Sequence, residues 1–300
     1  MTTARSRRAF LREGSLFLTA LSLAEAEGAL AQSTPATVAA LVTDVHFAEA
    51  DARGSRHYRE SIAKMREAAT TLGRRKPDIA IELGDFIDSA PKAGAKEEKA
   101  FLKRINEEFA TLCPRRHYVL GNHCVGKLSK KQFLETVEQK SSYYSFDRNG
   151  FHFIVLDACY RRDGVSYDAG NFEWTDTEIP PEQREWLKAD LKAAKGKALV
   201  FCHQRIDLEP GNEEGIHSSA TVREILRDSG KVLAAFMGHS HRNEYRQIDG
   251  VHYVALAAMV EGSGAENSGY SLLHAFPNGD LRLDGFRHHA ENPFARRSTR

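Results

Sequence analysis

Apolar and polar residues follow two alternating patterns along most of the chain. Short continuous apolar runs, typical of buried strands, predict strands over residues 38–45, 78–83, 117–120, 197–202 and 232–237. Apolar residues spaced three or four apart predict helices over residues 58–72, 96–112, 181–191 and 221–228. A hairpin over residues 143–146 and 151–156, and antiparallel strands after Tyr245, complete the pattern. This order of elements predicts an α/β fold in which mixed sheets are covered by helices.

The N-terminal segment has the composition of an export signal. Arg7 and Arg8 stand in a basic stretch that runs into an apolar segment over residues 15–24, which is too short to span a bilayer. Small residues precede Gln32, as a signal peptidase requires. We expect residues 1–31 to be a signal peptide and residues 32–300 to form a single catalytic domain. The twin-arginine export machinery would then deliver the protein to the periplasm or the exterior. The alternative is a frayed basic tail, and Glu25 and Glu27 slightly weaken the case for export.

Charge and cysteine content narrow the possible partners. The formal net charge is +1 over 300 residues, and no long run of one sign marks a nucleic-acid arm. We therefore expect neither a nucleic-acid polymer as partner nor a stable membrane span. The cysteines form no CxxC pair, which favours buried thiols over a disulfide framework; they are Cys113, Cys124, Cys159 and Cys202.

Residues 161–180 lack any regular periodicity but include Phe172 and Trp174. A loop of this length inside a compact domain is usually functional or disordered. Its aromatic residues favour a lid or a substrate wall.

Polar motifs follow the predicted strands at the points where they end. The motifs are Asp44-Val45-His46, Gly84-Asp85, Gly121-Asn122-His123, His203 and Gly238-His239-Ser240-His241. In open α/β sheets ligands gather beyond the carboxyl ends of the strands, so these side chains are expected to converge on one crevice. Each motif alone more often marks a turn, a surface residue or a hydrogen-bonded histidine. Five of them in this arrangement favour a shared site.

The residue types in these motifs indicate a metal site. Imidazole nitrogens combined with carboxylate and amide oxygens suit Mn, Fe, Zn or Co. Two divalent ions about 3.5 to 4 Å apart neutralise the attacking and leaving oxygens of a phosphate, and they need a bridging carboxylate. Asp85 is the natural bridge. The sequence therefore predicts hydrolysis of phosphoester or phosphoanhydride bonds, by attack of a hydroxide that bridges the two ions, on a small phosphorylated substrate.

In this order the motifs resemble those of the calcineurin-like metallophosphoesterase superfamily, whose pattern is DxH, GD, GNH, a lone H and GHxH. The resemblance runs from Asp44 to His241. It implies a four-layer αββα sandwich with a dinuclear metal site at the carboxyl ends of the strands. Within the superfamily the chain is similar to bacterial relatives of manganese-dependent ADP-ribose and CDP-alcohol diphosphatases, and to proteins labelled alkaline phosphatase.

The resemblance also assigns roles by position. It implies that Asp44, His46 and His241 hold one ion and that Asp85 bridges to the second. The remaining ligands of the second ion would be Asn122, His203 and His239. His123 would not bind metal but would contact the phosphate or the leaving oxygen, and Asn122 would lie beside it at the substrate.

Two departures from the family pattern bear on the substrate. Many members have an acidic residue where this chain has Cys124, and a proline is common where this chain has Arg205. Guanidinium groups pair with phosphate in bidentate fashion, so Arg205 is either a phosphate clamp or a member of a surface salt bridge. The metal ligands are unaffected, so the monoester, diester and pyrophosphate classes all stay open.

Other functional classes fit the sequence less well. A non-catalytic metal-binding or scaffold protein of the same fold is the main alternative, but such proteins typically lose ligands and none is missing here. A metallo-β-lactamase-like hydrolase requires HxHxDH, whereas Arg242 and Asn243 follow His241. A dehydrogenase is disfavoured because no GxGxxG opens a helix after the first strand.

Overall fold

Two mixed sheets form the framework of this computed structural model, which describes residues 8–12, 15–19 and 34–289. In sheet order, the first sheet contains β1 (Arg8–Arg12), β2 (Ser15–Thr19), β13 (Leu281–Arg287), β12 (Gly269–Ala275), β3 (Thr37–Val42), β4 (Ile79–Glu82) and β5 (Arg116–Tyr118). Strands β3, β4 and β5 are parallel, whereas β12 is antiparallel to both β3 and β13.

The second sheet contains β10 (Glu244–Ile248), β11 (Val251–Ala255), β9 (Val232–Met237), β8 (Lys197–Phe201), β7 (Phe151–Val155) and β6 (Tyr144–Arg148). Its four inner strands, β11, β9, β8 and β7, pair in parallel, and β10 and β6 flank them in antiparallel hairpins. The predicted hairpin of residues 143–156 is the β6–β7 pair.

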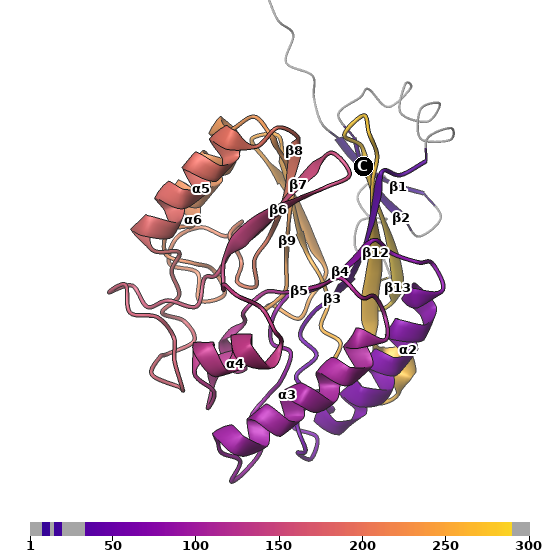
Figure 1. Cartoon of the computed structure of the whole chain (residues 1–300), viewed down its shortest axis with the longest axis vertical. Coiled ribbons are helices and arrows are strands. Elements are labelled where there is room, and N and C mark those ends of the chain that lie inside the picture. Colours follow the sequence, from indigo (N-terminus) through magenta and orange to yellow (C-terminus); the bar gives the residue numbers. More distant parts are fainter. Residues whose placement is uncertain (1–7, 13–14, 20–33, 290–300) are drawn as a thin grey trace, which may run out of the picture.

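Helices cover the outer face of each sheet (Figure 1). On the first sheet these are α2 (Ser61–Gly73) and α3 (Ala95–Ala110), with α4 (Lys130–Thr136) beside α3. On the second sheet they are α5 (Pro181–Ala193) and α6 (Ser219–Asp228). Short 3-10 turns occur at η1 (Tyr58–Glu60), η2 (Asn122–Val125) and η3 (Ala265–Asn267). The predicted four-layer αββα sandwich is confirmed.

Burial on both faces explains the continuous apolar runs in the sequence. In β3, Ala40 and Val42 pack toward the helices, while Ala39 and Leu41 pack between the two sheets. Phe201 of β8 stacks between Phe153 and Phe236 in the same inter-sheet core. Burying each such aromatic side chain contributes about 2–3 kcal/mol, so the sheets form a rigid base for the loops at their ends.

Most of the predicted elements lie within a few residues of the observed ones, and α4 is the main omission. Its sequence has a start signal that the hydrophobic pattern did not show. Ser129 accepts a hydrogen bond from the backbone of Gln132, whose side chain accepts one from the backbone N–H of Ser129. This capping box begins a helix too short to display a clear apolar period.

The structure describes only part of the predicted signal peptide. Strands β1 and β2 form an antiparallel hairpin at the edge of the first sheet, where β2 pairs with β13. The rest of residues 1–31 lies outside the described residues, and the cleavage before Gln32 stays a prediction. Within the described part of the chain, no helix is long and apolar enough to cross a membrane. All four cysteines are buried and free, as predicted.

Candidate metal centre

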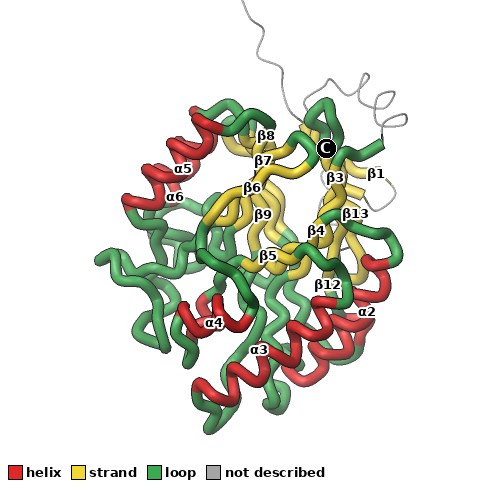
Figure 2. The backbone as a smooth tube through the Cα atoms, viewed as in Figure 1, coloured by secondary structure: helices red, strands yellow, loops and turns green. Residues whose placement is uncertain are grey.

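The predicted metal ligands stand on loops at the carboxyl ends of parallel strands. In the first sheet, β3, β4 and β5 lead to Asp44, Asp85 and Asn122. In the second sheet, β8 leads to His203, and β9 leads to His239 and His241. Loops gather along one side of the two sheets in Figure 2. The structure thus brings residues from both sheets together although they lie far apart in the sequence.

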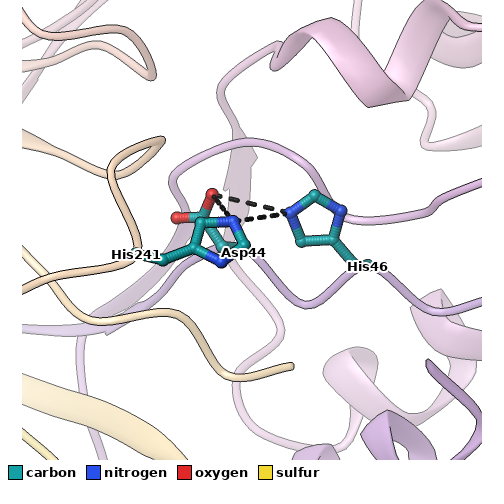
Figure 3. A group of neighbouring side chains, drawn as sticks. All are labelled: Asp44, His46 and His241. Atoms are coloured by element: carbon teal, nitrogen blue, oxygen red, sulfur yellow. Dashed lines mark hydrogen bonds and ion pairs between the residues drawn. The ribbon is translucent and has the colours of Figure 1, made fainter. Parts of the chain in front are cut away.

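Asp44, His46 and His241 form one group of facing side chains (Figure 3). The Nε2 atoms of the two histidines are 3.1 Å apart. The Oδ1 atom of Asp44 lies 3.4 Å from Nε2 of His241 and 3.7 Å from Nε2 of His46. Two ring nitrogens and one carboxylate oxygen therefore point at a common position, as ligands of one cation do.

Asp85, His203 and His239 form a second group. Nε2 of His203 is 3.0 Å from Oδ2 of Asp85 and 3.3 Å from Nδ1 of His239. Asn122 is buried at the start of η2, and its Oδ1 atom has no hydrogen-bond partner among the described residues. A buried acceptor without a partner costs about 1–3 kcal/mol, which a bound cation offsets. The donor set of this group fits a divalent metal ion.

Asp85 connects the two groups. Its Oδ2 atom lies 3.0 Å from Nε2 of His203 in the second group and 3.6 Å from Nε2 of His46 in the first. Its Oδ1 atom accepts a hydrogen bond of 2.8 Å from the backbone N–H of His123. This backbone contact fixes the carboxylate, so that one oxygen faces both groups at once.

Outer hydrogen bonds orient the histidine rings. Nδ1 of His203 donates to the carbonyl of Leu83 at 2.9 Å, which leaves the lone pair on Nε2. Asp88 accepts from Nδ1 of His46 at 3.0 Å and from Nδ1 of His123 at 2.9 Å. A single carboxylate therefore orients both a proposed metal ligand and the proposed substrate-contacting histidine.

Glu261 orients the ring of His241, the remaining proposed ligand of the first group. Its carboxylate accepts a hydrogen bond of 2.5 Å from Nδ1 of His241. The backbone around Glu261 is held by Lys64, whose buried ammonium donates to four consecutive carbonyls from Met259 to Gly262. This lysine fixes the loop that carries the carboxylate.

The backbone at these ligands is held in an unusual conformation. Positive φ angles between 45° and 68° occur at Asp44, His46, Asp85, His239 and His241. For residues other than glycine this left-handed conformation costs about 1–2 kcal/mol each. Such strain persists only where the surroundings enforce it, and it is concentrated at functional sites. Backbone hydrogen bonds from Asp44 to Gly84 and from His46 to Asp85 hold the two loops in place.

Gly84 shows why a glycine precedes a ligand. Its φ is +104°, and a Cβ at this position would lie 2.4 Å from Nδ1 of His203. Glycine permits the sharp turn with which a chain leaves a strand. At Gly84 the structure adds a second reason, because the backbone must approach the imidazole closely.

The aspartates of the site stay ionised despite their burial. Burial alone would raise the pKa of Asp44, but three neighbouring histidines hold it well below its ordinary value. The pKa values of Asp85 and Asp88 are lowered against burial in the same way. Burial lowers the pKa of His239 to about 3, whereas Asp44 and Glu261 outweigh burial and raise that of His241 to about 9. A cation at the first group therefore competes with a proton on His241.

Comparison with known proteins identifies the family. The sequence model described as calcineurin-like phosphoesterase matches residues 38–243. This chain belongs to the calcineurin-like phosphoesterase family. Its predicted class, a metal-dependent phosphoester hydrolase with two metal ions, is the class of this family, and the match spans all seven proposed metal ligands.

Relatives of the phosphoesterase agree with this assignment. A manganese-dependent ADP-ribose/CDP-alcohol diphosphatase from Arabidopsis thaliana is 23% identical over 280 residues, covering 74% of this chain and 85% of the relative. A dimetal phosphatase from Danio rerio has the same fold, with a TM-score of 0.68, 18% identity and coverage of 85% of this chain and 97% of that one. A purple acid phosphatase from yellow lupin (Lupinus luteus) seeds aligns with a TM-score of 0.56 and 16% identity, covering 86% of this chain and 52% of that one.

Arg205 does not occupy either of the environments expected for it in this phosphoesterase. The side chain is fully buried, so it belongs to no surface salt bridge. Its guanidinium donates to both carboxylate oxygens of Asp207 at 2.7 Å, to Glu244 at 3.0 Å and to the Ser240 hydroxyl at 3.0 Å. With its donors directed at these protein groups, Arg205 is not placed to clamp a phosphate. It instead holds Ser240, which lies between two of the proposed metal ligands, His239 and His241.

Three residues beside the candidate metal centre were not identified from the sequence: Asp88, Glu261 and Arg56. Asp88 lies three residues after Asp85, but the histidines that it contacts are 42 and 35 residues away in the chain. Glu261 contacts His241 across 20 residues. Arg56 lies beside Asp88, with 3.7 Å between Nη1 and Oδ2, and one third of its side chain is exposed. It brings an accessible positive charge close to both His123 and His241. This charge acts to lower the pKa of each histidine.

We predict that Arg205→Ala destabilises the protein without changing substrate affinity. Removing the guanidinium takes the closest partner from buried Asp207 and one partner from Glu244, which lowers the free energy of unfolding by about 3 kcal/mol. Arg246 beside Asp207 and Arg242 beside Glu244 limit the loss. Thermal denaturation measures this change, and Arg227→Ala is the control because its ion pairs are at the surface. An unchanged Tm together with a raised Michaelis constant would restore the phosphate-clamp role.

Proposed function

We propose that this phosphoesterase hydrolyses a small compound that carries a phosphate or diphosphate group, using two divalent ions. Asp44, His46 and His241 hold one ion, and Asp85 contacts both. The second ion is held by Asn122, His203 and His239. The observation that carries this assignment is the position of the Asp85 Oδ2 atom, which lies within 3.6 Å of a ring nitrogen in each group.

The chain's own residues provide orientation and proton transfer. When bound, the two ions supply positive charge for the phosphoryl oxygens and lower the pKa of coordinated water. Nδ1 of His123 is fixed by Asp88, which leaves Nε2 of this partly exposed ring to donate to the leaving oxygen. Burial opposes protonation of His123, but Asp85 and Asp88 raise its pKa, which favours the donor form.

Arg56 takes the substrate-contacting role that the sequence suggested for Arg205. Its ion pair with Asp88 is longer than a hydrogen bond, and its side chain reaches solvent beside the site. A guanidinium in this position can pair with a phosphate oxygen that the ions leave free. Since the Arabidopsis relative is named as a manganese-dependent diphosphatase of ADP-ribose and CDP-alcohols, we propose manganese as the ion and nucleotide diphosphates as the first substrates to test.

Paired variants separate the metal and proton roles. The manganese-loaded protein is expected to hydrolyse at least one of p-nitrophenyl phosphate, bis-p-nitrophenyl phosphate and ADP-ribose. Asp85→Asn should lose activity and bound metal, because it removes the charge that faces both groups. His123→Ala should keep its metal content, measured by elemental analysis, while turnover falls about 10²- to 10⁴-fold.

Two results would contradict this proposal. Loss of metal in His123→Ala would make this residue a ligand rather than a proton donor. Absence of hydrolysis with every divalent ion tested, in a protein that binds two ions, would favour the scaffold alternative.

We also propose that residues 1–31 direct export through the twin-arginine machinery, to the periplasm or beyond. The arrangement of basic, apolar and small-residue segments supports this proposal. The hairpin of β1 and β2 lies at the edge of the first sheet, so its removal leaves the strands that carry the ligands in place.

N-terminal sequencing tests this proposal. Protein recovered from the periplasm of a host with an active twin-arginine pathway is expected to begin at Gln32. The variant with Arg7→Lys and Arg8→Lys should stay in the cytoplasm, because the pathway requires the arginine pair. Recovery of exported protein that still begins at Met1 would contradict the cleavage.

A further inference from the structure

Trp174 is an exposed aromatic residue beside the metal centre. Its side chain is 43% exposed, although tryptophan is highly buried on average. The centroid of its indole lies 5.7 Å from that of His239, a proposed ligand of the second ion. Among the described residues, the exposed large hydrophobic side chains are Trp174 and Val165, both in residues 161–180. The indole is therefore both exposed to solvent and close to the second group of proposed ligands.

The segment that carries Trp174 is fixed from within. The buried ring of Tyr167 stacks on Phe172 with 3.9 Å between centroids. The Tyr167 hydroxyl lies 3.1 Å from the carbonyl of Glu173 and 2.7 Å from that of Asp176. These two carbonyls bracket Trp174 in the sequence. The backbone on either side of the indole is thus held by one buried side chain.

The same segment is attached to the turn that carries Asn122 and His123. The backbone N–H of Gly170 donates to the carbonyl of Val125 at 2.9 Å. Gly170 has a φ of +79°, and a Cβ there would lie 2.7 Å from the carbonyl oxygen of Gly126. Residues 161–180 contain no helix and only the isolated bridging residue Ser166. These attachments favour a fixed wall over a mobile lid.

From this geometry we infer that Trp174 is a stacking platform for a nucleobase on the substrate, which makes the substrate a nucleotide. This inference rests on the proposed function, because it places the base on the group attached to the reacting phosphate. Because the backbone on both sides of this indole is fixed, a planar ring can cover it without the cost of ordering the loop. Base stacking on an aromatic side chain requires no base-specific hydrogen bond, so adenine and cytosine nucleotides both fit.

A matched pair of ligands isolates the contribution of the base. AMP and ribose 5-phosphate share the sugar and the phosphate and differ by the base alone. Both are measured as inhibitors of the hydrolysis that the wild-type, metal-loaded protein performs. AMP should bind the wild type about tenfold or more tightly than ribose 5-phosphate. Trp174→Ala should weaken the binding of AMP until it equals that of ribose 5-phosphate. Trp174→Phe should keep most of the preference for AMP, because phenylalanine also offers an aromatic face.

Two further measurements separate stacking from a general effect on the loop. Val165→Ala, at the other exposed apolar position of the segment, should leave both inhibition constants unchanged. The chain has two tryptophans, so Trp186→Phe leaves Trp174 as the sole tryptophan, whose fluorescence can be excited selectively. In that variant AMP should quench the fluorescence, and ribose 5-phosphate should not.

The outcomes distinguish this inference from the proposed function. If the wild type hydrolyses the substrate and Trp174→Ala changes the inhibition constants of both ligands equally, Trp174 is not a platform for the base. An unchanged fluorescence signal with saturating AMP would overturn it as well. Absence of hydrolysis in the wild type would instead overturn the proposed function on which the platform depends.

Discussion

The structure depends on one arrangement of buried charge. Asp44, Asp85 and Asp88 are ionised and buried at the junction of the two sheets, and imidazoles surround them. Burying a carboxylate is costly unless it is paired, so these residues need partners of positive charge. Histidines whose ring nitrogens lie 3.1 to 3.3 Å apart supply only part of that pairing. Two divalent cations, as the family uses, would complete it, and this requirement links the fold to the chemistry.

The sheets make this arrangement possible because their apolar packing is independent of the site. The stacked core of Phe153, Phe201 and Phe236 fixes the two sheets relative to each other. The loops that leave the sheet ends can then adopt left-handed conformations at the ligands, whose combined cost is several kcal/mol. The packing energy of the core therefore compensates for the strained backbone at the site. The left-handed backbone conformations direct side chains from both sheets toward one position.

The sequence predicted those parts of the molecule that depend on local pattern. Strands buried on both faces appear as continuous apolar runs, and the ligands stand directly after them. Asp88, Glu261 and Arg56 were missed because their roles depend on contacts between distant loops. Arg205 was misjudged because the sequence does not show that this side chain is buried with its guanidinium paired to Asp207 and Glu244. Helix α4 was missed because a capping box, rather than an apolar period, marks it.

The central claim is that two ions share the Asp85 carboxylate. X-ray diffraction from crystals of the manganese-loaded protein, with data at the manganese absorption edge, tests it most directly. We predict two anomalous peaks about 3.5 to 4 Å apart, with the Asp85 carboxylate between them and Asn122 beside one. A single peak at the first group, with Asn122 and His239 away from any metal, would contradict the account.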